Sequence, residues 1–240
     1  MLASLTSGNH VAMLGRAGFA AAHNATPFPQ ISSHVLRVAR DTELYAEGSP
    51  SHHVYQVLAG AARTCKLLGD GRRQIGFFAL PGDWIGLDAA TRHLYAAEAV
   101  KATVLLCFSR REIDALARTE PTAAQLVQGV LREGLAAAER RILMFGRKTA
   151  MERMASFLAD MDARLMDARL ADGARGCFTL PMARGDIADY LGLTAETVSR
   201  MLSELRRRRA IALEGTQSVR ILDRAWFEGL SGEETPRYSA

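Results

Sequence analysis

The sequence lacks several features that would place it in a class at once. It contains no run of 18 or more apolar residues, so no segment is long enough to span a membrane as a helix. The stretch before Arg16, the first charged residue, has no sustained apolar core, so a secretory signal is not expected. The three cysteines among the 240 residues, Cys65, Cys107 and Cys177, lie far apart and form no disulfide framework. These absences favour a cytoplasmic protein with no membrane partner.

The features of an enzyme are also missing. All six histidines lie at or before His93, which excludes a histidine-dependent active site in the C-terminal half. The chain has no glycine-rich phosphate loop, no cluster of metal ligands and no plausible pair of nucleophile and histidine. We therefore expect neither catalysis nor a bound cofactor. The net charge of +4 is too small to identify a nucleic-acid-binding protein by itself.

The length of 240 residues favours two domains, and the first has the pattern of a β domain. Residues 1–26 are small and weakly patterned, and they are predicted to form a flexible arm. From Pro27 to about Ser109, short apolar runs alternate with turns, which favours a small antiparallel barrel or sandwich. The Asp70-Gly71 pair predicts a hairpin whose two central residues take positive φ. The expected strands include residues 54–58, 64–68, 74–80, 95–100 and 103–108.

Near Arg111 the apolar period changes from that of strands to that of a helix. Steps of four and three residues then alternate along one helix face, which carries Leu131, Leu135, Ala138, Ile142 and Phe145. This narrow apolar seam can pack on the β domain or pair with its copy in a second subunit, and the pattern alone favours neither. Gly146 is predicted to end the helix, and Thr149 and Glu152 have the spacing of a capping box that starts the next one.

Residues 180–222 have the pattern of a helix-turn-helix followed by a hairpin. A short amphipathic helix is expected at 186–191, and Gly192 suits the left-handed turn that follows it. Thr194 can cap a second helix, expected from Ala195 to about Arg207. The buried face of this helix is predicted to carry Val198, Met201, Leu202 and Leu205. Residues 211–214 and 219–222 are predicted to be the two strands of a wing.

The other face of this second helix carries residue types that read DNA. Glu196 and Arg200 are four residues apart and project from the same face, with Ser199 beside them. Arg can donate two hydrogen bonds to guanine and Glu can accept one from cytosine, and the first turns of a recognition helix reach the base edges. The run Arg206–Arg209 can meet phosphates. Further candidates for DNA contact are Thr194, Thr197 and Arg184. Each feature alone is also typical of a solvated ion pair or charged surface, but together they favour DNA binding.

The run from Leu180 to Arg200, LPMARGDIADYLGLTAETVSR, resembles the helix-turn-helix of the Crp/Fnr family of bacterial transcription regulators and is most similar to its FixK-type branch. The resemblance extends upstream through VYQVLAG (54–60), DGRRQIG (70–76) and LPGDWIGLD (80–88). It covers roughly residues 30–225, and its helix-turn-helix portion is highly specific.

The resemblance implies an α+β fold: an N-terminal antiparallel β-roll of the cyclic-nucleotide-binding type, a long dimerisation helix and a C-terminal winged helix-turn-helix. The corresponding segments are 27–120, 121–146 and 147–225, followed by a tail at 226–240. The resemblance therefore favours pairing of the apolar seam in a homodimer, which would read a palindrome in double-stranded DNA. Fnr-like members read half-sites resembling TTGAT with a Glu-x-x-Ser-Arg signature, which Glu196, Ser199 and Arg200 match. Such regulators are mostly activators that contact RNA polymerase.

The sequence departs from the family at its effector sites. Leu87 takes the place of the ribose-binding Glu of nucleotide-binding members, and His93-Leu94 that of their phosphate-binding Arg-Ser pair, so we expect poor binding of cyclic AMP. Oxygen-sensing members hold an iron–sulfur cluster through four cysteines, three of them near the N-terminus, whereas this chain has none before Cys65. Cys65 and Cys107 are expected to be buried in strands. Cys177 is a candidate redox-sensitive residue.

Two alternative functions remain open at this point. A gas-responsive regulator of the same fold would bind haem, for nitric oxide or carbon monoxide, through a histidine such as His34, His52, His53 or His93, although loop or surface positions would explain all four. A regulatory subunit of the cyclic-nucleotide type would share the β-roll and bind no DNA, but the winged segment argues against it.

Overall fold

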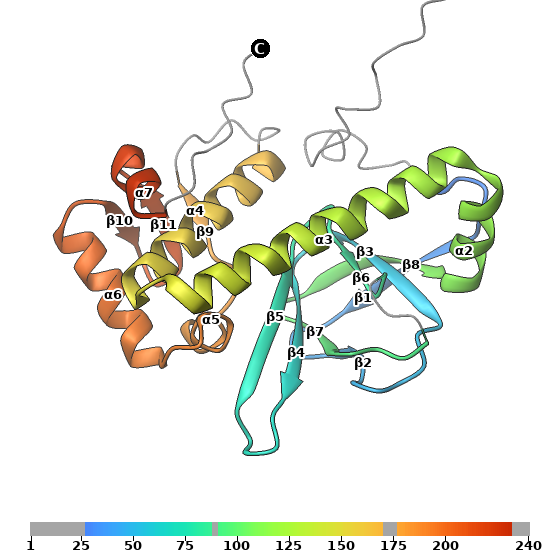
Figure 1. The fold of residues 1–240 in the computed structure, drawn as a ribbon, viewed down its shortest axis with the longest axis horizontal. Helices are drawn as coiled ribbons and strands as arrows, with labels where there is room; N and C mark the ends of the chain where they lie inside the picture. The colour runs from blue at the N-terminus through green and yellow to red at the C-terminus, as the bar shows by residue number, and fades with distance from the viewer. Residues whose placement is uncertain (1–26, 88–90, 170–176, 232–240) are drawn as a thin grey trace, which may run out of the picture.

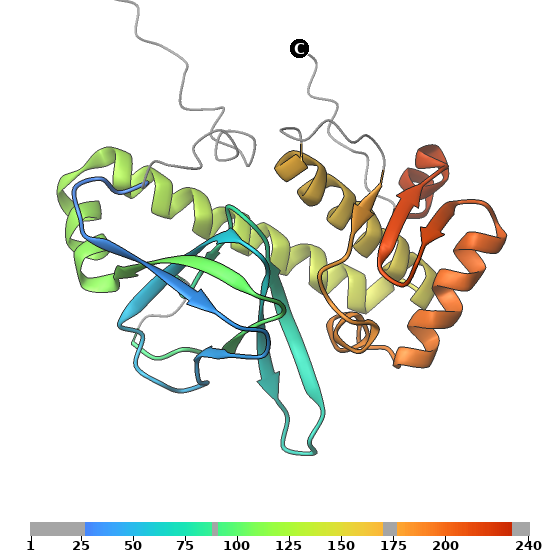
Figure 2. The same cartoon turned by 180° about the vertical axis from the view of Figure 1, so that it is seen from behind.

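The structure, a computed structural model, describes residues 27–87, 91–169 and 177–231. The predicted arm at 1–26 lies outside these residues. The long helix α3 (Pro121–Arg147) runs along a β-roll and reaches a helical C-terminal domain at its far end (Figure 1). In the view from behind, the strands of the roll lie in front of α3 (Figure 2). The order of segments agrees with the fold class that the sequence predicted.

The β-roll consists of two antiparallel four-stranded sheets, ordered β1-β8-β3-β6 and β2-β7-β4-β5. Their strands are β1 (Ser33–Val38), β2 (Glu43–Tyr45), β3 (His53–Ala59), β4 (Ala62–Leu67), β5 (Arg73–Ala79), β6 (Trp84–Ile85), β7 (Ala96–Ala99) and β8 (Thr103–Ser109). Val57, Ala62, Ala97 and Leu105 form part of a fully buried cluster within the roll. A second cluster, which includes Phe108, Ile113 and Ala123, packs the roll against α2 (Arg110–Thr119) and α3.

The five strands expected from the sequence correspond to β3, β4, β5, β7 and β8, whereas β1, β2 and β6 gave no clear signal. The sequence of β1, SHVLRV, lacks a strict alternation of apolar and polar residues. The strand is mostly exposed, and its Val35 is 54% exposed. The hairpin between β4 and β5 has a different turn from the one predicted. Only Gly71 takes positive φ, at 84°, and its N–H donates to the Leu68 carbonyl. The expectation that Asp70 also takes positive φ is wrong, because the turn is closed by a single left-handed glycine.

The helix α3 continues past the predicted end at Gly146 and stops at Arg147, where Lys148 takes an extended conformation. The predicted capping box is present: Glu152 Oε2 accepts a hydrogen bond from Thr149 N at 2.7 Å, and Thr149 Oγ1 accepts one from Glu152 N at 3.4 Å. These bonds lower the pKa of Glu152 and start α4 (Ala150–Arg169). The capping box, rather than a glycine, therefore fixes the point at which the chain changes direction.

The C-terminal domain continues with β9 (Phe178–Thr179), α5 (Arg184–Leu191), α6 (Ala195–Arg207), β10 (Ile211–Glu214), β11 (Ser218–Ile221) and α7 (Arg224–Ser231). The wing strands form a three-stranded sheet in the order β10-β11-β9. The predicted boundary at 225 is wrong, because it cuts α7 near its start. Asp223 Oδ1 accepts a hydrogen bond from Trp226 N, and Phe227 is buried, so this segment is a packed helix and not a tail.

The two domains share a continuous apolar core. The Phe78 ring of β5 lies 6.3 Å from the Phe157 ring of α4 and 5.3 Å from the Tyr190 ring of α5. Burial raises the pKa of Tyr190 above its ordinary value. Among the described helices, none has the length and apolarity needed to cross a membrane.

Candidate nucleic-acid interface

The helix-turn-helix is held by local interactions that the sequence predicted. Gly192 takes the left-handed conformation, with φ 64° and ψ 42°, and ends α5. Thr194 caps α6, because its Oγ1 accepts a hydrogen bond from Thr197 N at 3.1 Å. Val198, Leu202 and Leu205 are buried as expected, together with Ile187 and Leu191 of α5. Met201 also packs against this core as predicted, but it is only half-buried and lines the groove along α6 as well.

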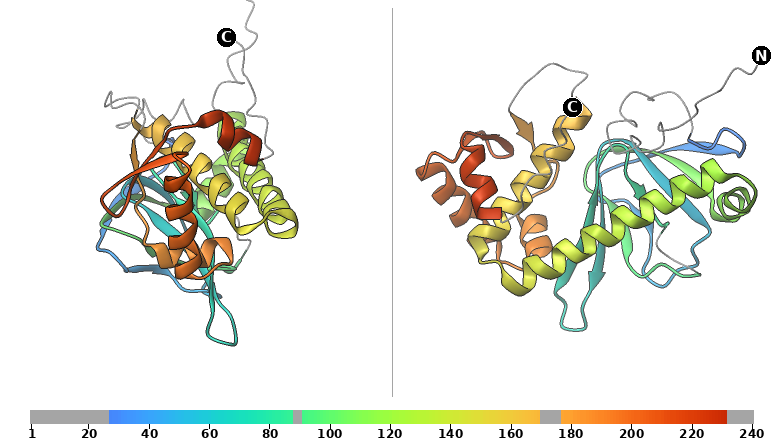
Figure 3. Two further views of the ribbon diagram at one scale, coloured as in Figure 1. Left: turned by 90° about the vertical axis from the view of Figure 1, so that its left-hand side faces the viewer. Right: turned by 45° about the horizontal axis from the view of Figure 1, so that its top comes forward.

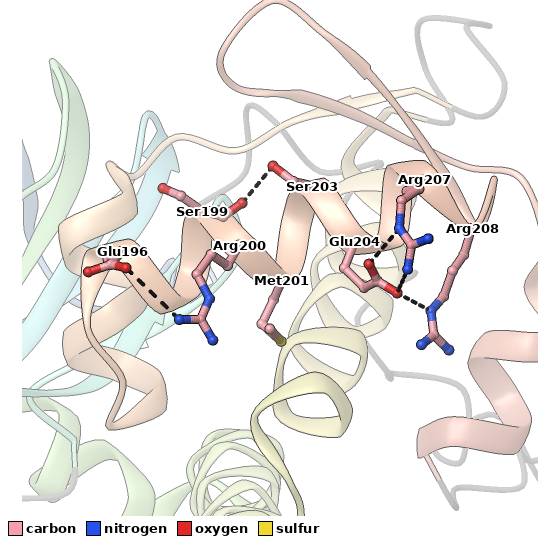
Figure 4. A pocket seen from close by; sticks show the side chains of 8 residues that line it. All are labelled: Glu196, Ser199, Arg200, Met201, Ser203, Glu204, Arg207 and Arg208. Atoms are coloured by element: carbon pink, nitrogen blue, oxygen red, sulfur yellow. Dashed lines mark hydrogen bonds and ion pairs between the residues drawn. The ribbon is translucent and has the colours of Figure 1, made fainter.

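That outer face of α6 is open to solvent. The side chains of Glu196 and Arg200 are 81% and 68% exposed, and the Arg200 guanidinium lies 3.9 Å from the Glu196 carboxylate. Figure 4 shows the two side chains next to each other at one end of an open groove along the helix. An exposed ion pair at this distance contributes little, so breaking it to contact bases costs little. Both side chains are therefore available to a ligand that approaches α6.

Ser199 and the neighbouring candidates are less free than Arg200. The Ser199 hydroxyl donates to the Ala195 carbonyl at 2.9 Å and accepts a hydrogen bond from Arg184 Nη1 at 3.1 Å. The Thr194 and Thr197 hydroxyls lie 2.9 Å apart, so each has a partner within the cap. The structure thus brings all six predicted DNA-contacting residues to one region. Arg184, Thr194, Thr197 and Ser199 are hydrogen-bonded to one another or to the helix, whereas Glu196 and Arg200 form only the loose ion pair.

The four arginines at the end of α6 fall into two groups. Arg207 and Arg208 both bond to Glu204, at 2.8 Å and 2.7 Å, and these hydrogen bonds lower the pKa of Glu204 to about 2. Arg206 and Arg209 are exposed, and no ion pair to either is found among the residues that the structure describes. Half of the predicted phosphate-binding run is thus already paired with a carboxylate.

The predicted apolar seam of α3 lies on the surface of the single chain. Leu135 and Ile142 are 63% and 72% exposed, and Leu131 is also exposed. Ala138 is half-buried, and Phe145 is partly covered by Arg153 and the Gly192 turn. The alternative in which the seam packs on the β-roll of its own chain is therefore wrong. Leu143, which was not predicted to belong to the seam, is also exposed, at 62%, and is the neighbour of Ile142 in the sequence.

The residues at the expected nucleotide site do not fit a cyclic nucleotide. Leu87 packs against the apolar cluster beneath α2, and Leu94 is exposed. His93 lies in the loop before β7, as expected, but it is buried rather than at the surface, and its ring stacks on Tyr45 at 3.5 Å between centroids. Arg92 is nearby, but its guanidinium donates to the Gly48 carbonyl at 2.6 Å. None of these four side chains supplies the ribose-binding carboxylate, and the Arg92 guanidinium is bonded to the backbone.

The other candidate groups are placed as follows. Cys65 and Cys107 are buried as predicted, and burial raises the pKa of Cys65 to about 11 and that of Cys107 above its ordinary value. The Cys177 sulfur is half-buried and lies 3.9 Å from Glu214 Oε2. Within residues 27–87, 91–169 and 177–231, no group of three or more potential ligands is arranged to hold a metal ion. His34, His52 and His53 are exposed.

A β-roll, a long helix with an exposed apolar seam and a winged helix-turn-helix with an open recognition face together define a DNA-binding transcription regulator. Comparison with known proteins agrees with this class. The model of the cyclic nucleotide-binding domain matches residues 35–120, and that of the Crp-like helix-turn-helix domain matches residues 152–230. The chain belongs to the Crp/Fnr family.

Individual relatives support the same assignment. The nitrogen fixation regulation protein FixK of Rhizobium meliloti is 42% identical over 180 residues, which cover 75% of this chain and 79% of the relative. The transcriptional activatory protein AadR of Rhodopseudomonas palustris is 36% identical over 204 residues, which cover 85% of this chain and 83% of the relative. The structure of FixK2 from Bradyrhizobium japonicum matches with a TM-score of 0.78 and 40% identity, covering 83% of this chain and 98% of that one. These relatives are transcription regulators and not enzymes, as the sequence predicted for this chain.

Proposed function

We propose that the protein is a transcription activator that acts in the cytoplasm and binds, as a homodimer, a palindromic DNA site with half-sites resembling TTGAT. The observation that carries this proposal is the open face of α6, where Glu196 and Arg200 are exposed in the first two turns of a helix whose opposite face is buried. Arg200 would donate to guanine, Glu196 would accept from cytosine, and Ser199 would contact a base or the backbone. Thr194, Thr197 and Arg184 lie at the rim of this face and are proposed to contact phosphates.

The exposed seam of α3 supports the homodimer. Large apolar side chains such as Leu135 and Ile142 rarely gather on the surface of a chain that has no partner. Pairing of two α3 helices would bury them and would give the two recognition helices two-fold symmetry, which is the symmetry of a palindrome. Sedimentation equilibrium of the purified protein is expected to give the mass of a dimer, and a monomer at micromolar concentration would contradict the seam assignment.

Activation of transcription, with RNA polymerase as a partner, is supported by the names of relatives such as AadR and the Cereibacter sphaeroides transcriptional activator protein FnrL. The residues that would contact the polymerase are not assigned. A promoter with the selected site upstream of a reporter is expected to gain output when the protein is present, and a fall in output would indicate a repressor.

The base-reading role is tested by Arg200→Ala. This variant is expected to lose most of its preference for the TTGAT palindrome over random DNA in a competition gel shift, since one bidentate contact in each half-site contributes about 1–3 kcal/mol of discrimination. Arg111→Ala serves as the matched control, because Arg111 is an exposed arginine on α2, outside the helix-turn-helix. Equal retention of the palindrome by the two variants would refute the role of Arg200. The circular dichroism of both variants is expected to match that of the wild type.

A further inference from the structure

A network of buried ion pairs joins the β-roll to the first helix of the helix-turn-helix. Arg63 of β4 donates from Nη1 to both carboxylate oxygens of Asp186 on α5, at 3.0 Å and 3.1 Å. The two side chains are only 9% and 7% exposed, although they lie 123 residues apart in the sequence. Figures 1 and 3 show α5 beside the β4–β5 hairpin, and α5 contacts β5. We refer to this set of contacts as the interdomain clamp.

Arg63 is itself fixed from the opposite side. Its Nη2 bonds to Glu98 Oε2 of β7 at 2.7 Å, and the same nitrogen lies 3.4 Å from Asp41 Oδ1. A planar guanidinium with partners on two sides has little freedom to change its orientation. Arg63 therefore transmits the position of the sheet to Asp186.

The clamp has a second arm on the neighbouring strand. Arg73 of β5 bonds to Asp186 Oδ1 at 2.6 Å and to Asp189 Oδ2 at 2.8 Å. Gln74 donates from Nε2 to the Asp189 carbonyl at 2.8 Å, one of the last carbonyls of α5, which lack partners within the helix. The same Gln74 nitrogen also lies 3.5 Å from the Tyr190 carbonyl oxygen, so three side chains of the hairpin hold two side chains and two carbonyls of α5.

Only Lys148 and Thr149 separate α3 from α4, so the covalent connection limits the directions that the C-terminal domain can take. The clamp adds a second attachment, because it joins the roll to α5. The positions of the two recognition helices in a dimer set the separation of the half-sites that can be read. We propose that Arg63 and Arg73 are positioning residues for DNA recognition: they hold α5, and through it α6, at the angle to α3 that matches one half-site separation. This inference rests on the proposed function as a dimeric reader of palindromes.

The experiment measures the preferred separation of half-sites rather than stability. Wild-type protein, Arg63→Met and Arg72→Met are each used to select from a pool of duplexes in which two TTGAT half-sites flank a spacer of varied length. Methionine keeps the apolar stem of the arginine and removes its charge. Arg72 is the control, because it lies on the same hairpin, is 77% exposed and bonds to Asp70 outside the clamp.

The wild type and Arg72→Met are expected to select one spacer length. Arg63→Met is expected to accept spacers one base pair longer and shorter, and its affinity for the preferred palindrome is expected to fall by about tenfold, or about 1.4 kcal/mol. Its affinity for a duplex with a single half-site is expected to change less than about twofold, because the face of α6 is intact. An effect on stability alone would leave the selected spacer unchanged.

Asp186→Asn is the second variant, since it preserves the size of the side chain and removes only the charge, and it decides the question if Arg63→Met does not fold. A single selected spacer and unchanged affinity in the folded variants would overturn the role of the clamp. If the wild type itself selects no symmetric site, the proposed function is wrong. If the wild type and the variants all select the same palindrome with the same spacer, only the role of the clamp is wrong.

Discussion

The arginines of the domain interface and those of α6 carry the same charge in opposite surroundings. Arg63 and Arg164 are 9% and 5% exposed and bond to carboxylates from both domains, whereas Arg200 is 68% exposed with only a loose ion pair. A buried arginine must have its partners in place, so it fixes geometry. An exposed arginine keeps its charge available to a ligand. Under the two proposals above, the buried arginines would set the orientation of α6 and the exposed arginine would contact the DNA.

The largest expected effect on stability comes from Arg164 on α4. Its guanidinium bonds to the Phe78 carbonyl and to Asp83 in the roll, and to Asp160 one turn away. Burial acts to lower the pKa of Arg164, but the charges of Asp83 and Asp160 outweigh it and raise the pKa, so the group stays charged. Arg164→Met would remove this cation from Asp83, whose side chain is only 14% exposed, and the free energy of unfolding is expected to fall by about 3 kcal/mol in urea denaturation.

The control for Arg164 is Arg207→Met, which removes an arginine of α6 that is 76% exposed and bonded to Glu204. This substitution is expected to leave the urea midpoint unchanged, because solvent screens an exposed ion pair. Equal shifts of the urea midpoint in the two variants would contradict this prediction, since they would show that burial does not determine how much an arginine contributes to stability.

The distance along the sequence between interacting residues decides which features could be predicted. The Gly192 turn, the Thr149–Glu152 box and the Glu196–Arg200 face depend on residues within four positions of one another, so spacing alone was sufficient to predict them. The pairing of Arg63 with Asp186 spans 123 residues and leaves no local pattern, so sequence reasoning missed it.

The error at α7 has a different cause. Asp223 stands three residues before Trp226, and apolar side chains follow it, which is a helix start that the sequence contains. At Asp70-Gly71 the sequence predicted the hairpin but not the conformation of its turn. That conformation depends on how the two strands pair, which the local sequence does not determine.

A smaller effect is expected from Arg206, which lies at the exposed end of α6. Arg206→Ala is expected to weaken binding to all DNA sequences about equally, because a phosphate contact carries no sequence information. The slope of the logarithm of the binding constant against the logarithm of salt concentration is expected to become less steep by about 2, because the homodimer loses about 1 in each half-site. Fluorescence anisotropy at several salt concentrations measures this slope, with Arg111→Ala as the control that should leave it unchanged. Loss of preference for one base pair would instead make Arg206 a base reader.

The smallest expected effect comes from Arg209, where exposure and backbone conformation act against each other. Arg209 takes φ 59° in the left-handed region, and the hydrogen bonds from Arg209 N to the Arg206 carbonyl and from Ala210 N to the Leu205 carbonyl form the motif that usually ends a helix at glycine. Arg209→Gly relieves the strain of a side chain in this conformation, partly offset by the greater freedom of glycine in the unfolded chain, so a gain of about 0.5 kcal/mol is expected.

The matched variant Arg209→Ala removes the same charge but keeps a Cβ in the left-handed region, so its stability is not expected to rise. If Arg209 meets a phosphate, the two variants lose DNA affinity equally, while only the glycine variant unfolds at a higher urea concentration. Together these two results would show that Arg209 increases DNA affinity and lowers the free energy of unfolding. Equal stability of the two variants would show that the strain is negligible, and unchanged DNA affinity would show that the charge at Arg209 serves no contact.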